Sequence, residues 1–168
     1  MTRGPRLLQV RAALALLLAG LAGCGFHLQG VARLPPVFAV TALESEDRYT
    51  DLHQALAESL KVAGSHVVGR GEPAGAELEI LSEDSGQRVL SVSATNSPTE
   101  YEVYYTVRYR VRVDGREVLA PQVLTLNKDY SFDEAAILAK EQEQQQIHAA
   151  LARELANLIM RRLTAVAP

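Results

Sequence analysis

The chain of 168 residues contains a single cysteine, Cys24, and this scarcity excludes several kinds of site. One thiol cannot form an internal disulfide, and it cannot supply the paired cysteines of a CxxC metal or redox motif. The four histidines are scattered, with no pair at metal-ligand spacing, and the sequence contains no GxSxG, HExxH or P-loop motif. We therefore predict no catalytic residue, no metal ligand and no dissociable cofactor.

Excess positive charge is also lacking. The whole chain has a formal net charge of -3, and Arg3, Arg6 and Arg11 lie among the first 23 residues, which contain no acidic side chain. Without that segment, 14 basic residues face 20 acidic ones, a net charge of -6. Nucleic acid binding requires clustered Lys and Arg to neutralise phosphates, so nucleic acid is not expected as the main partner.

No hydrophobic run is long enough to span a bilayer. The longest, from Ala12 to Ala22, has 11 residues, whereas a membrane-spanning helix needs about 17 or more. Because arginines precede it, this run is typical of an export signal. Leu21-Ala22-Gly23-Cys24 follows and resembles the lipobox of bacterial lipoproteins, which implies covalent N-acyl and S-diacylglycerol lipid on Cys24. The alternative is an ordinary secretory cleavage region with a buried free thiol.

The residue after the cysteine bears on localisation. It is Gly25 rather than aspartate, which by resemblance to the bacterial sorting rule points to the outer membrane. Two or three acyl chains would anchor the protein to the inner leaflet of that membrane, on the periplasmic side, since one chain alone binds only marginally. The predicted organisation is a signal peptide (1–23), a lipidated N-terminus and tether (24–36), one domain (37–164) and a short tail (165–168).

The clearest structural pattern spans residues 101–113, where apolar side chains take the odd positions and polar ones mostly the even positions. This period of two is typical of a strand with one buried face. Asp114-Gly115 suits a type I′ turn, and the β-rich run 116–126 follows, so a hairpin is predicted. A two-residue loop fixes its register. The predicted cross-strand pairs are Val113–Arg116, Arg112–Glu117, Val111–Val118, Tyr109–Ala120, Val107–Gln122, Tyr105–Leu124 and Val103–Leu126.

The remaining elements complete an order of strand, helix, three strands and helix. A strand is predicted over 37–43 and a helix over 51–63, capped by Thr50 or Asp47. A long strand, or two pieces kinked at 84–86, covers 78–93, with Glu83 and Asp84 as exposed turn carboxylates. The last helix begins at a cap at Asp133 and ends near Leu163. Since a helical crossover makes the first two strands parallel where adjacent, the predicted fold is α+β, with two helices on one face of a four-stranded mixed sheet.

Two polar surfaces are candidate binding sites. Residues 140–146, with the sequence KEQEQQQ, give the last helix about two turns without an apolar position. These turns either project into water or meet a polar partner, for which Glu141, Gln142 and Gln145 are the candidate residues. Arg108, Arg110 and Arg112 form a basic stripe on the hairpin, which is either a solvated strand face or a surface for the phosphates of a lipid headgroup.

Several blocks together resemble the LptE family of lipopolysaccharide-assembly lipoproteins. They are residues 22–28 (AGCGFHL), Glu100-Tyr101, Lys128-Asp129-Tyr130 and residues 138–143 (LAKEQE). The resemblance implies two helices on a four-stranded sheet. It also implies a plug inside the β-barrel LptD that helps this barrel assemble and binds lipopolysaccharide.

The resemblance carries over to few residues. In LptE-like proteins, a basic residue at the third position of the Leu-Ala-Lys block contributes to lipopolysaccharide contact, and Lys140 occupies this position. A second family basic residue precedes the Glu-Tyr pair, where this chain has residues 94–96 (ATN) instead; Arg88 or the stripe residues Arg108 and Arg110 would replace it. Two other functions stay open, an outer-membrane scaffold that binds another envelope protein without lipopolysaccharide, and a periplasmic hydrolase, which lacks a nucleophile with a base.

Overall fold

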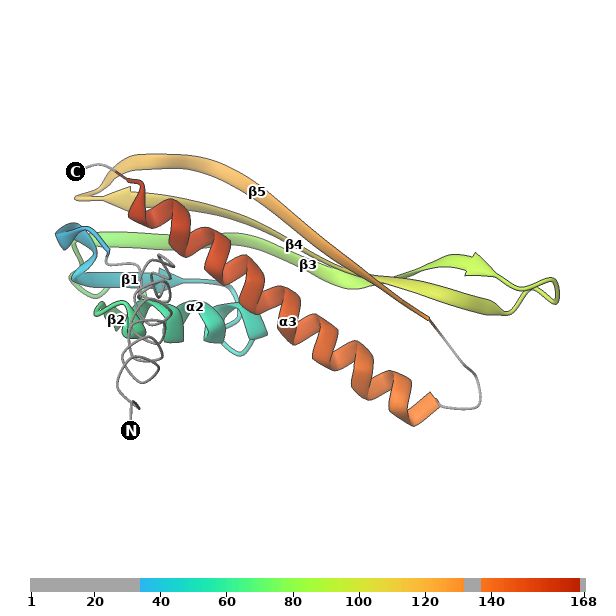
Figure 1. Ribbon diagram of the computed structural model, residues 1–168. Coiled ribbons are helices and arrows are strands. Elements are labelled where there is room, and N and C mark those ends of the chain that lie inside the picture. Colours follow the sequence, from blue (N-terminus) through green and yellow to red (C-terminus); the bar gives the residue numbers. More distant parts are fainter. Residues whose placement is uncertain (1–33, 132–136, 167–168) are drawn as a thin grey trace, which may run out of the picture. The chain divides into compact units, whose positions relative to one another are not determined.

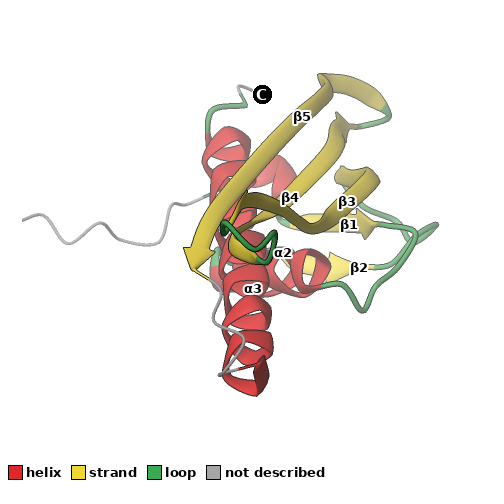
Figure 2. Ribbon diagram, turned by 90° about the vertical axis from the view of Figure 1, so that its right-hand side faces the viewer, coloured by secondary structure: helices red, strands yellow, loops and turns green. Residues whose placement is uncertain are grey.

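The structure, a computed structural model, describes residues 34–131 and 137–166, with side chains of the last segment from Lys140 onward; Cys24 and Asp133 lie outside these ranges. Five strands form one sheet in the order β2-β1-β3-β4-β5, and two helices cover one of its faces (Figures 1 and 2). The elements are the 3-10 helix η1 (Pro36–Phe38), β1 (Val40–Glu44), α2 (Asp51–Val62), β2 (His66–Val68), β3 (Ala76–Val92), β4 (Pro98–Val113), β5 (Arg116–Ser131) and α3 (Ile137–Thr164).

The α+β class and both helices are confirmed, but the predicted strand number is wrong, because the sheet has five strands rather than four. The missed strand, β2, has only three residues and pairs in parallel with β1, Val40 opposite His66. Strand β1 also pairs in parallel with β3, as the helical crossover predicts. The predicted first strand is too long, since Pro35 and Pro36 place residues 36–38 in η1 and the strand begins at Val40.

Helix α2 forms as its sequence predicts. The Thr50 hydroxyl oxygen accepts the His53 backbone N–H at 3.1 Å, which satisfies one of the free donors of the first turn. The leucines at positions 52, 56 and 60 share one helix face, and all three are fully buried. Gly64, at φ +90°, ends the helix in a conformation that few other residues adopt.

The β4–β5 hairpin is confirmed, and its turn residues Asp114 and Gly115 have the positive φ angles of a type I′ turn. The predicted register holds only for the first two pairs. A first bulge shifts β5 by one residue, giving Val111–Leu119, and a second raises the shift to two residues, so that the further pairs are Tyr109–Gln122, Val107–Leu124, Tyr105–Leu126 and Val103–Lys128. Pro121 lies in the bulged segment, where a missing N–H is tolerated because β5 is the sheet edge. The shift also places Leu124 rather than Gln122 beside the buried Val107.

Strand β3 is continuous over 17 residues, with bulges after Ile80 and Val89. Glu83 and Asp84 therefore lie within a strand, and their prediction as turn residues is wrong. Asp84 is exposed, but Glu83 is half-buried and hydrogen-bonded. The long antiparallel pairing of β3 with β4 continues beyond the sheet's helix-covered part (Figure 1).

One hydrophobic core lies between the helices and the inner face of the sheet, the face that carries the odd-numbered residues of β4. Tyr105 and Tyr109 are its largest members, and Leu155 and Ile159 of α3 pack against it. Leu158 of the same helix is only partly buried. Neither helix within the described ranges is both long and apolar enough to cross a membrane.

Candidate functional site

Lys140 lies near the start of α3 and faces the end of β5. Its ammonium donates to Glu143 Oε2 at 2.7 Å and lies 5.9 Å from the centre of the Tyr130 ring. Tyr130 in turn donates its hydroxyl to Gln87 Oε1 at 2.9 Å, and burial, followed by the neighbouring Tyr101, raises the pKa of Tyr130 above its ordinary value. The Lys140 side chain is only 18% exposed, so an anionic ligand must compete with Glu143 for this cation.

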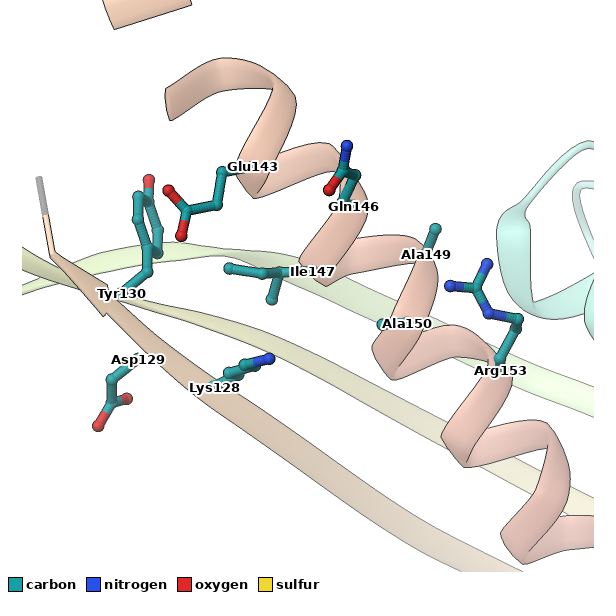
Figure 3. A pocket seen from close by; sticks show the side chains of 9 residues that line it. All are labelled: Lys128, Asp129, Tyr130, Glu143, Gln146, Ile147, Ala149, Ala150 and Arg153. Carbon is teal, nitrogen blue, oxygen red and sulfur yellow. The ribbon is translucent and has the colours of Figure 1, made fainter. Parts of the chain in front are cut away.

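A pocket of about 660 Å³ adjoins this cluster between β5 and α3 (Figure 3). Lys128 and Arg153 extend toward it from opposite walls, and Ile147 and Ala150 lie between them. Neither cation has an ion-pair partner among the described residues. The full lining is Lys128, Asp129, Tyr130, Glu143, Gln146, Ile147, Ala149, Ala150 and Arg153.

The outer face of the sheet, which neither of the described helices covers, carries the arginine stripe. Arg110 Nε and Nη2 lie 2.7 and 2.6 Å from Glu79 Oε2. Arg112 contacts the same Glu79 oxygen at 3.1 Å and Glu77 Oε2 at 3.0 Å. Carboxylates of β3 thus neutralise two of the three guanidinium groups. Arg108 alone is exposed and has no hydrogen bond or ion pair with the described part of the chain.

Arg88 lies on the same outer face, toward the far end of β3. It forms an ion pair with Glu102 and lies 5.9 Å above the Tyr104 ring. The Arg88 side chain is 65% exposed, whereas Glu102 is among the buried residues. Asn127 donates its amide to the other Glu102 oxygen at 2.5 Å. Strand alternation assigned Glu102 to a wet face, so its burial under these neighbours was missed.

The structure separates the predicted lipopolysaccharide contacts into two groups. Lys140 lies on the helix-covered side of the sheet, whereas the alternation of β3 and β4 places Arg88, Arg108 and Arg110 on the outer face. The predicted partner residues Glu141, Gln142 and Gln145 are exposed on α3. Their side chains are therefore accessible to solvent or to a polar partner.

A polar cluster inside the fold was not predicted, because it joins four elements that are distant in sequence. Tyr105 donates its hydroxyl to Glu83 at 2.5 Å, and Thr50 donates to the other oxygen of this carboxylate at 3.1 Å. His148 lies 3.0 Å from Asp51 and packs its ring on Tyr105. Burial, and then the hydrogen bond to Glu83, raises the pKa of Tyr105 above its ordinary value. The cluster connects the start of α2 to α3 and the sheet.

One serine–histidine contact occurs in the part of the chain that the structure describes. Ser45 Oγ lies 2.7 Å from His53 Nδ1 and 2.8 Å from the Asp47 carbonyl oxygen, to which it donates its only proton. His53 Nδ1 is then the donor to Ser45, so it cannot serve as the base for this hydroxyl. Residues 34–131 and 137–166 also contain no group of His, Cys, Asp and Glu able to hold a metal ion. These contacts give the hydrolase hypothesis no support.

Comparisons with known proteins agree with the resemblance found in the sequence. The family model "LptE: Lipopolysaccharide-assembly" matches residues 39–163. The chain is 26% identical over 146 residues to the LPS-assembly lipoprotein LptE of Pectobacterium atrosepticum, covering 86% of this chain and 79% of that protein. It is 27% identical over 165 residues to the LPS-assembly lipoprotein LptE of Yersinia enterocolitica, covering 96% and 77%.

A solved structure supports the fold. The solution NMR structure of an uncharacterized lipoprotein B from Nitrosomonas europaea is similar with a TM-score of 0.69 and 24% identity, covering 84% of this chain and 91% of that one. The family model alone spans well over half of the chain. The chain therefore belongs to the LptE family of lipopolysaccharide-assembly proteins.

Proposed function

We propose that the protein is an outer-membrane lipoprotein that occupies the lumen of the β-barrel LptD, helps this barrel assemble, and binds lipopolysaccharide. The observation that carries the first part is the polar character of the uncovered sheet face. Arg110 and Arg112 alternate there with Glu77 and Glu79, and Thr106 and Thr125 share a hydrogen bond at 3.0 Å. Such a face is suited to the polar interior wall of a barrel.

Depletion tests the barrel partnership. Loss of the protein should leave LptD misassembled, visible as a loss of its folded, heat-modifiable form on electrophoresis. Resupply of the mature protein should restore that form. Normal LptD assembly after depletion would contradict this part of the proposal and leave the scaffold alternative.

The lipopolysaccharide contact rests on cations next to apolar surface. Arg108 is an exposed cation without a described partner and lies opposite Val123, which is 60% exposed. Farther along the sheet, Arg88 precedes Val89, Leu90 and Val92, which are 47%, 45% and 52% exposed. Guanidinium groups bind phosphates well, and exposed aliphatic side chains suit acyl chains, so these two places on the sheet fit an amphiphile with anionic groups.

Charge reversal tests the Lys140 contact. Lys140→Asp should weaken lipopolysaccharide binding, and the loss should be largest at low salt because it is electrostatic. Lys61→Asp, an equal charge change at an exposed position in the last turn of α2, serves as the matched control. Equal binding by both variants at low salt would remove Lys140 from the site.

The scaffold alternative, without lipopolysaccharide contact, has one observation in its favour. Lys140, Arg88 and Arg110 are already paired with Glu143, Glu102 and Glu79, so three of the four proposed cations have intramolecular partners. A mature protein that supports LptD assembly but shows no saturable binding of purified lipopolysaccharide would establish this alternative.

The membrane anchor is a separate part of the proposal. Acylation of Cys24 predicts that the wild type incorporates labelled palmitate and fractionates with outer membranes. Cys24→Ser should lose the label, and labelling that persists in this variant would contradict a lipid on this residue.

A further inference from the structure

Strand β5 forms one edge of the sheet, because among the described strands β4 is its only neighbour. The two halves of this edge differ. Residues 118–121 contain the bulges and Pro121, features that discourage further strand pairing. From Gln122 to Ser131 the register with β4 is unbroken and there is no proline. This second half presents a regular row of backbone groups, which is a template for pairing with another strand.

The same half of the edge borders two hollows along α3. The side chains that β5 directs toward the helices include Gln122 and Lys128, which lie opposite the inward-facing Tyr109 and Val103. Lys128 lines the pocket of about 660 Å³, and Gln122 lines a second pocket of about 550 Å³. The other residues of the second pocket are Val118, Leu119, Arg162, Ala165 and Val166.

Each hollow contains basic side chains, although the whole chain is acidic; the carboxylate of Glu143, which also lines the first hollow, is paired with Lys140. Lys128 and Arg153 have no ion pair with any residue of the described ranges, and Asp129 points away from the pocket (Figure 3). Within the described part of the chain, Arg162 donates hydrogen bonds only to neutral groups, the Tyr109 hydroxyl and the Gln122 amide oxygen, each at 3.3 Å. Burial raises the pKa of Tyr109, so its hydroxyl stays uncharged beside Arg162. Each hollow thus has a cation available for a carboxylate.

We propose that the β5 edge from Gln122 to Ser131 binds an extended segment of a partner protein as a sixth strand. The segment carries acidic side chains at two inward positions six residues apart, the separation of Gln122 and Lys128. At about 3.3 Å per residue this separation is roughly 20 Å along the strand. One carboxylate meets Lys128 and Arg153, and the other meets Arg162, while the backbone pairs with β5.

Charge argues against a second copy of this chain as the occupant. Within residues 122–131 the only cation is Lys128, which faces inward, and the only acidic residue, Asp129, faces outward beside Glu102. A β5 strand from a second copy would therefore bring another ammonium group into an already basic groove. The inference is independent of lipopolysaccharide binding, and it adds to the proposed function a specific edge and a sequence pattern for a protein partner.

The test uses the full mature protein in detergent and a synthetic peptide of alternating valine and threonine. Two aspartates stand six residues apart, symmetrically about the peptide centre, so that parallel and antiparallel addition both place them in the hollows. Binding is measured by fluorescence anisotropy, and hydrogen exchange follows the amides of residues 122–131. We expect saturable binding of the peptide. We also expect hydrogen exchange to become at least tenfold slower for the backbone amides of residues 122–131 that point away from β4.

Matched probes separate strand addition from simple charge attraction. The same peptide with its pairing edge N-methylated should bind at least tenfold more weakly, as should a version with lysines in place of the aspartates. The variant Lys128→Glu with Arg153→Glu should weaken binding of the aspartate peptide and strengthen binding of the lysine peptide, while Arg162 still favours aspartate at the second hollow. Equal binding of the N-methylated peptide, unchanged exchange over residues 122–131, or protection of these amides by self-association without peptide would each overturn the proposal.

Discussion

Replacing Glu143 with glutamine should strengthen lipopolysaccharide binding, because it releases the Lys140 ammonium for an incoming phosphate. The two side chains are three residues apart on α3, with Nζ and Oε2 separated by 2.7 Å. Lys140 is mostly covered, but Glu143 is 44% exposed, so solvent weakens the pair. Pairs of this kind contribute about 0.3–1 kcal/mol.

Removal of the competing carboxylate should therefore raise affinity by roughly two- to fivefold, at about 1.4 kcal/mol per factor of ten. The opposite change is larger. Lys140→Gln removes a charge-assisted hydrogen bond to phosphate, worth about 1.5–3 kcal/mol, and should lower affinity by roughly tenfold or more. Neither substitution should reduce the free energy of unfolding by more than about 1 kcal/mol, since the pair is partly solvated.

The assay is titration of the purified mature lipoprotein with lipopolysaccharide at low salt, repeated at about 0.5 M salt, where charges are screened within a few ångströms. Glu141→Gln is the matched control, because it makes the same change in net charge at an exposed neighbouring position. A gain for Glu143→Gln that exceeds the control and shrinks with salt supports the Lys140 site. Equal gains in affinity for both variants would show only the long-range electrostatic effect of the changed net charge. A loss of affinity for Glu143→Gln would refute the reasoning.

Three further predictions concern stability, each measured by urea unfolding. Burial, and then the charge of Arg48, lowers the pKa of His53 below its ordinary 6.5. As the pH falls, the unfolded chain therefore binds a proton at this histidine before the folded chain does, so the free energy of unfolding should decrease below about pH 6.5. The variant His53→Gln should flatten this pH dependence. An unchanged pH dependence would contradict that assignment. Thr50→Ala should cost about 1 kcal/mol through loss of the helix cap together with the hydrogen bond to Glu83, whereas Thr50→Ser should retain most of this stability; equal losses would argue against a role of the hydroxyl. Gly75→Ala should cost about 1–3 kcal/mol, because a Cβ there would lie 2.9 Å from the Val37 carbonyl oxygen, and a neutral substitution would show that this contact relaxes freely.

Local patterns predicted much of the fold. The period of two over residues 101–113, the Asp114-Gly115 turn and the leucine stripe of α2 each depend on neighbours in sequence, and each is present. Strand β2 was missed because three residues carry no measurable periodicity and become a strand only beside β1. The register failed beyond Val111 because bulges are set by which side chains the core accepts, as well as by turn length.

In the candidate site, too, contacts between residues close in sequence could be predicted, whereas contacts between distant residues could not. The pairing of Lys140 with Glu143 is a contact between residues three apart and was accessible from the KEQE sequence. Arg110 and Glu79, which form an ion pair, are 31 positions apart in the sequence. The sequence therefore predicted a basic stripe, whereas the structure pairs two of its arginines with carboxylates of the neighbouring strand. The burial of Glu102 also depends on long-range pairing, since Arg88 and Asn127 approach it from the two neighbouring strands.

The most direct test of the proposed role is to isolate the tagged protein, lipid included, from gently solubilised outer membranes and to determine what accompanies it. A polar domain that fills a barrel lumen should emerge in a stable, stoichiometric complex with LptD that resists high salt. Recovery of the lipoprotein as a free monomer, with LptD folded and separate in the same extract, would contradict the proposal that this domain acts inside the barrel.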